Sequence, residues 1–118
     1  MFLRHSIKAV MVLLLSLFSF NVFSQAPQRI EITAKKYSFD PASITLKKGV
    51  PVVLVLTSRD TTHGLEIKEL GVNTKLPKGE TVEVPVTPEH AGTFQGKCSV
   101  FCGFGHGRMK MTVEVTEQ

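Results

Sequence analysis

Period-two alternation of apolar and polar side chains is the feature that most limits how this chain can fold. Four segments show it, residues 30–34, 43–47, 81–86 and 109–115. Successive side chains of a β-strand point to opposite faces of a sheet, so each segment predicts a strand with one face in a core. Residues 52–56 are apolar throughout, which indicates a strand that is buried on both faces.

Turn signals separate these segments and favour an all-β fold. They are Asp40-Pro41, Lys48-Gly49, residues 77–79, Pro88 and Gly92. No stretch of ten or more residues has the pattern of an amphipathic helix. Several short strands at this spacing predict a single β-sandwich.

The N-terminal 24 residues have the composition of a secretory signal peptide. Arg4 and Lys8 precede an apolar run over residues 9–20, and Ser24 ends a plausible cleavage site. We therefore expect a signal peptide over residues 1–24 and a periplasmic or secreted domain over residues 25–118. An uncleaved membrane anchor is the alternative, although the apolar run is shorter than the ~20 residues that span a bilayer.

The charge of the expected domain argues against several functions. Without Arg4 and Lys8, 12 of the 14 Lys and Arg residues remain against 10 Asp and Glu, a net charge of +2. With this balance and no basic run, no nucleic-acid partner is expected. The chain shows no catalytic base and no Ser/His/Asp set, so a hydrolytic enzyme is disfavoured and no small-molecule substrate is expected.

Both cysteines of the chain lie in one short segment near the C-terminus, together with possible metal ligands. In order, these residues are Cys98, Cys102, His106 and Met109. Residues 93–97 are expected to form a further strand, which ends at Cys98. A second histidine, His63, falls in the predicted loop that leaves the central apolar strand. Loops at one end of a sandwich can bring all five side chains together. Thiolate, imidazole and thioether donors form a soft set, which points most directly to redox-active copper.

The residues alone leave the kind of site open. Cys102, His106 and Met109 with His63 form the ligand set of a mononuclear blue-copper site. The second thiolate, from Cys98, would allow two thiolates to bridge two copper ions. In an oxidising compartment the two cysteines can instead form a structural disulfide. Zinc bound by two cysteines and two histidines would leave Met109 without a role, and Met109 can also be ordinary core.

The segment from Cys98 to Met109 resembles the CuA loop of cytochrome c oxidase subunit II, whose pattern is Cys-x3-Cys-x3-His-x2-Met. Residues 37–41, 44–49 and 87–94 are similar to strand and turn segments of cupredoxins. The resemblance covers essentially all of residues 29–115. It implies a cupredoxin-like, Greek-key β-sandwich.

The resemblance also implies a binuclear copper centre. In that family pattern, Cys98 and Cys102 bridge both copper ions. The remaining donors form one pair for each ion, His63 with Met109 and the backbone carbonyl of Val100 with His106. An electron-transfer role is implied, with a redox protein or a membrane respiratory complex as partner. Storage or delivery of copper to a membrane oxidase, or a mononuclear carrier, are the alternatives.

Three departures from the subunit II pattern favour a stand-alone soluble copper protein over a conventional oxidase subunit. Val100 replaces a glutamate that helps to hold magnesium in that family. The chain has no Trp, which is the usual electron-entry residue there, and no pair of transmembrane helices follows the predicted signal peptide. Without that tryptophan, Phe101 and Phe104 are the candidates for a partner-docking collar around the site, with ordinary packing as the alternative.

Overall fold

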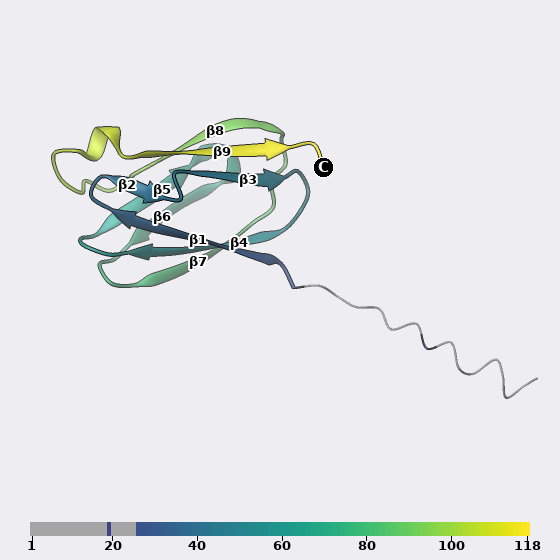
Figure 1. Ribbon diagram of the computed structural model, residues 1–118, viewed down its shortest axis with the longest axis horizontal. Coiled ribbons are helices and arrows are strands. Elements are labelled where there is room, and N and C mark those ends of the chain that lie inside the picture. The colour runs from purple at the N-terminus through teal and green to yellow at the C-terminus, as the bar shows by residue number, and fades with distance from the viewer. Residues whose placement is uncertain (1–18, 20–25) are drawn as a thin grey trace, which may run out of the picture.

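The computed structural model describes Ser19 and residues 26–118 (Figure 1). Apart from Ser19, the predicted signal peptide over residues 1–24 lies outside the described residues. The signal peptide, and the start of the domain at residue 25, therefore stay predictions. Among the described residues, no helix is long and apolar enough to cross a membrane.

Within residues 26–118, nine strands form two sheets that pack face to face as a β-sandwich (Figure 1). One sheet has the order β2-β1-β4-β7 and the other has the order β3-β9-β8-β5-β6. The strands are β1 (Gln28–Lys35), β2 (Ser38–Asp40), β3 (Ser43–Lys47), β4 (Val52–Ser58), β5 (His63–Ile67), β6 (Val72–Leu76), β7 (Thr81–Val86), β8 (Gly92–Lys97) and β9 (Lys110–Thr116). In the described part of the chain, the helices are two 3₁₀ turns, η2 (Lys68–Leu70) and η3 (His106–Arg108).

The alternating segments became strands because one face of each strand enters the core. Along β9, Met111, Val113 and Val115 are buried, while the residues between them are exposed. The apolar β4 is the exception that the sequence predicted, since it lies between β1 and β7 and buries residues on both faces. Full burial of an aliphatic side chain stabilises the fold by about 1.5–3 kcal/mol. Because buried side chains lie on many strands, this stabilisation is distributed over the whole sandwich.

Three strands were missing from the sequence prediction, namely β2, β5 and β6. His63 was expected in a loop, but it is the first residue of β5, where it is paired with Leu76 of β6. The second residue of β5 is Gly64, and glycine is depleted in strands. The residue pattern of β5 was therefore too weak to predict a strand there.

Four loops meet at one end of the sandwich, which we call the site end. They comprise residues 36–37, 59–62, 77–80 and 98–109, each following a strand that runs toward this end. Backbone hydrogen bonds connect them: Arg59 N donates to Ala34 O, and Gly79 N donates to Ser58 O. Figure 1 shows the β8–β9 loop with η3 at this end, opposite the C-terminus.

Candidate metal centre

The β8–β9 loop carries most of the candidate ligands and is closed by a hydrogen bond at its base. The backbone N–H of Cys98 donates to the carbonyl of Met109 at 3.1 Å. Within the loop, the backbone N–H of His106 donates to Gly103 O, which begins the η3 turn. The first and last ligand candidates of the loop therefore lie side by side, and η3 carries His106 between them.

The two cysteine sulfurs lie 3.0 Å apart at the centre of the site. Both side chains are buried and both thiols are free. Since a disulfide bond is about 2.05 Å long, these sulfurs are not bonded to each other. The structure thus holds two neighbouring thiols rather than the structural disulfide that was an alternative in the sequence.

Two further donors lie beside each sulfur. Nδ1 of His63 is 3.8 Å from the Cys98 sulfur, and the carbonyl oxygen of Val100 is 3.1 Å from it. Around Cys102, Nδ1 of His106 lies at 3.6 Å and the Met109 sulfur at 3.7 Å. The fold therefore brings together every ligand candidate that the sequence indicated, including the backbone carbonyl. The donor atoms of His63 and the two cysteines all lie within 4.8 Å of one another.

Three of the distances between these donors fit a bound metal ion. Metal bonds of about 2.0–2.3 Å in a tetrahedral arrangement separate neighbouring nitrogen and sulfur donors by about 3.5–3.8 Å. The nitrogen–sulfur and thioether–sulfur distances of 3.6–3.8 Å lie in this range. The set is rich in sulfur and imidazole, which suits copper better than magnesium or calcium.

His63 is fully buried and is oriented by a carboxylate that the sequence analysis missed. Its Nε2 lies 2.8 Å from Oδ1 of Asp60, while its Nδ1 faces Cys98. With Asp60 as acceptor, Nε2 carries the proton and Nδ1 is left free for a metal. The available signal was the position of Asp60 in a turn, three residues before a candidate ligand.

Asp60 is itself held in place. Its other carboxylate oxygen accepts a hydrogen bond of 2.8 Å from the backbone N–H of Lys36. Burial acts to raise the pKa of Asp60, but the hydrogen bonds that it accepts from Lys36 and His63 oppose this, and the pKa is lowered from its ordinary value. The carboxylate is thus ionised at neutral pH and able to orient the imidazole.

The Cys102 thiol holds its proton tightly when no metal is bound. Burial, followed by the hydrogen bond with Cys98 and the charge interactions with Cys98 and Asp60, raises the pKa of Cys102 from 9.0 to about 12. A metal ion binds the thiolate, so it must displace this proton. Metal affinity at this site should therefore increase with pH.

Tyr37 supports the loop from below and is a second residue that the sequence analysis missed. A Cβ atom at Gly103 or at Gly105 would overlap the Tyr37 ring, so both glycines are needed for this close approach. The guanidinium carbon of Arg108 lies 5.5 Å from the centre of the same ring. The loop thus rests on an aromatic side chain from the turn between β1 and β2.

Phe101 and Phe104 lie on the outside of the loop. Phe101 is 74% exposed and Phe104 is fully exposed. The Phe101 ring lies 5.8 Å from the His106 ring, measured between centroids, with an angle of 45° between the planes. Neither aromatic side chain is used in the core, so the packing alternative does not account for them.

A two-sheet β-sandwich that carries one histidine on a strand and a Cys–His–Met loop between its last two strands is a cupredoxin-type metal-site scaffold. The family model for the cupredoxin-like domain matches residues 8–113, and the chain belongs to this family. The match begins inside the predicted signal peptide, which it does not test.

Relatives with similar sequences include subunits of cytochrome c oxidases. The probable cytochrome c oxidase subunit 2 of Streptomyces avermitilis is 40% identical over 73 residues, which cover 62% of this chain and 23% of the relative. Cytochrome c oxidase subunit 2 of Thermus thermophilus is 28% identical over 88 residues, 75% of this chain and 65% of the relative. The chain thus spans from about a quarter to just under two thirds of the length of these relatives.

Solved structures agree on the fold. The periplasmic domain of subunit II of cytochrome oxidase (CoxB) of Bradyrhizobium japonicum matches with a TM-score of 0.71 and 19% identity, covering 80% of this chain and 88% of that domain. The metal binding domain of the Streptococcus pneumoniae D39 Cu(I) exporting P-type ATPase CopA matches with a TM-score of 0.66 and 23% identity, covering 80% and 91%. At these identities the likeness establishes the cupredoxin-like sandwich.

Proposed function

We propose that this chain is an electron-transfer protein with a binuclear, CuA-like copper centre. One observation carries the proposal: two buried thiols lie 3.0 Å apart, and two further donors lie beside each. A mononuclear site would use only one of the two thiols as its thiolate ligand. The kinship with oxidase subunit 2 sequences supports the same function.

The distribution of the outer donors supports two bridging sulfurs. His63 and the Val100 carbonyl lie beside Cys98, whereas His106 and Met109 lie beside Cys102. In the proposed centre, His63 with Met109 would hold one ion, and His106 with the Val100 carbonyl would hold the other. Each pair would draw one donor from beside each cysteine, so both thiolates would be needed to hold either ion.

Bound copper would supply one-electron redox chemistry at this position. The protein contributes rigid positioning: Asp60 orients His63, Tyr37 supports the loop, and burial of both cysteines excludes water. Because the rigid sandwich holds these donor atoms, their positions should change little when the centre gains or loses an electron. A small reorganisation on reduction is what an electron carrier needs, and it favours transfer over exchangeable copper delivery.

We propose that the domain acts on the exported side of a membrane, after removal of residues 1–24. A respiratory complex or another redox protein would be its partner. The oxidase relatives and the periplasmic domain with the same fold support this assignment.

Copper analysis and electron paramagnetic resonance (EPR) test the nuclearity. The loaded protein should contain about two copper ions per chain, with one unpaired electron spread over two copper nuclei. Cys98→Ser should reduce this to one copper and a four-line spectrum, because Cys102, His63, His106 and Met109 still form a mononuclear set. One copper and a four-line spectrum in the unchanged protein would refute the binuclear centre.

A further inference from the structure

The charged side chains on the loops of the site end are mainly basic. The four loops carry Lys36, Arg59, Lys78 and Arg108 against only Asp60 and Glu80, and all six are exposed. Asp60 also faces inward, because its carboxylate contacts His63 and the backbone of Lys36. The loops at the opposite end, residues 48–51, 68–71 and 87–91, carry two basic and two acidic residues. The positive charge is thus concentrated around the metal site.

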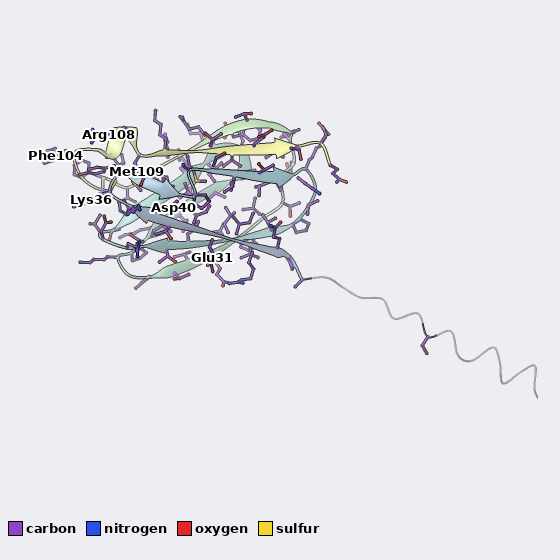
Figure 2. All side chains as sticks on the ribbon, in the orientation of Figure 1. Glu31, Lys36, Asp40, Phe104, Arg108 and Met109 are labelled. Atoms are coloured by element: carbon purple, nitrogen blue, oxygen red, sulfur yellow. The ribbon has the colours of Figure 1, made fainter. Side chains whose placement is uncertain are left out.

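The basic residues share the site end with exposed aromatic side chains. Phe104 is fully exposed and Phe101 is 74% exposed, with its ring against His106. Figure 2 shows Phe104, Arg108 and Lys36 at the same end of the molecule, well away from Glu31. Exposed aromatic side chains inside a polar rim are typical of a surface that binds another protein.

The rim is partly fixed in position before any partner arrives. The Arg108 guanidinium lies over the Tyr37 ring, which also supports the metal loop. The backbone of Lys36 is held by Asp60, and the backbone of Arg59 by Ala34. Among the described residues, none of the four basic side chains of these loops forms an ion pair within the chain. They remain available to carboxylates of a partner.

We propose that the site end docks an acidic redox protein, whose carboxylates surround an apolar contact area. This inference rests on the proposed electron-transfer function. Opposite charges steer such an encounter and fix its orientation, with His106 and Phe101 facing the partner's cofactor. One electron passes from the reduced partner to the metal centre, and no bond forms or breaks. A protein is favoured over a lipid surface, because the proposed electron transfer needs a partner that carries a redox cofactor of its own.

A matched pair of probes tests the sign of the charge. Lysine-rich cytochrome c in its ferrous form is compared with the same protein after succinylation, which converts its lysines to carboxylates. The copper-loaded chain should oxidise the succinylated form faster at low ionic strength, by on the order of tenfold. Its rate should fall as salt is added, the rate of the native form should rise, and the two should converge.

Charge-reversal variants locate the effect. Lys36→Glu and Arg108→Glu should each slow oxidation of the succinylated probe several-fold at low salt. Lys68→Glu changes the net charge equally but lies in η2 at the opposite end, and should have a much smaller effect. Equal effects of all three variants would mean that only net charge matters, and would overturn the docking site.

Binding is also measured without copper. In the metal-free protein, succinylated cytochrome c should shift the NMR signals of Lys36 and of residues 98–108, and the native form should not. Shifts at the opposite end, or none, would overturn the proposal. Sedimentation of the protein with phosphatidylglycerol vesicles is the second check. If the protein sediments with the vesicles and Phe104→Ser abolishes this binding, the site end binds lipid and the proposal is overturned.

The two proposals fail in different ways. Equal, salt-independent rates with both probes would refute the acidic partner and leave electron transfer standing. No electron exchange with either probe in a copper-loaded protein would refute the proposed function, while the NMR shifts still decide whether this end binds an acidic protein.

Discussion

Asp60 and His63 form a hydrogen bond of 2.8 Å that connects an exposed loop carboxylate to a fully buried imidazole. The bond occupies Nε2, so that Nδ1 points at the Cys98 sulfur. His63, the ligand candidate outside the β8–β9 loop, is thereby oriented by a residue of the loop that precedes its strand.

Removing this carboxylate should weaken metal binding without abolishing it. Partners that orient a ligating histidine typically contribute 10–100-fold in metal affinity, so Asp60→Ala should lower copper affinity by about that factor. Competition with a chelator of known affinity measures it. Glu80→Gln is the matched control, since Glu80 is an exposed acid on a loop of the same end. If both variants bind copper as the unchanged protein does, Asp60 has no orienting role.

Two buried methionines near the start of β9 should respond differently to the same substitution. The Met109 sulfur lies 3.7 Å from Cys102, whereas Met111 packs in the core against Gly96. Met109→Leu should change the absorption spectrum and redox potential of the copper-loaded protein, because a weak axial ligand is lost. Met111→Leu conserves volume and should cost less than about 1.5 kcal/mol, with the spectrum unchanged. Identical spectra for both variants would show that Met109 is only core.

The raised pKa of Cys102 predicts how the stability of the reduced, metal-free protein depends on pH. The thiol ionises near pH 9.0 when unfolded and near pH 12 when folded. Above pH 9 the folded state therefore binds more protons than the unfolded state, and stability should fall as pH rises from about 9 to about 12.

Urea unfolding at a series of pH values measures this slope. Cys102→Ala removes the thiol and should give a flatter profile over the same range. A profile as steep in the variant as in the parent would assign the loss to other groups.

Any side chain larger than glycine at position 64 should destabilise the protein, because the β8–β9 loop lies directly against Gly64. A Cβ at this position would overlap Ser99 Oγ and lie 2.9 Å from a methyl of Val100. Gly64→Ala should destabilise the protein by about 1–3 kcal/mol and, by moving the Val100 carbonyl away from Cys98, alter the copper spectrum. Thermal unfolding and EPR measure the two effects.

Gly107→Ala, in the β8–β9 loop, is the control substitution for Gly64→Ala. Gly107 has open space where a Cβ would be, so its variant should leave both stability and spectrum nearly unchanged. A Gly64→Ala variant as stable as Gly107→Ala would mean that the loop can move without cost.

The all-β sandwich and the candidate ligand set were determined by the sequence itself. Period-two alternation encodes a strand with one buried face wherever it occurs, which is why β3, β7 and β9 were predicted from residues 43–47, 81–86 and 109–115. The spacing from Cys98 to Met109 is equally local, since one loop holds these ligands. Short strands with weak patterns, β2, β5 and β6, needed their neighbours to form.

Only the tertiary structure decided which distant residues complete the site. His63 lies 35 residues before Cys98, and its distance to that sulfur depends on how β5 pairs with β6 and β8. The hydrogen bond that Asp60 accepts from His63 and the position of Tyr37 beneath the loop follow from the same packing. So does the basic rim: the sequence shows a nearly balanced charge, and the meeting of four loops concentrates Lys36, Arg59, Lys78 and Arg108 at one end. Contacts of this kind depend on the path of the whole chain, which no local pattern records.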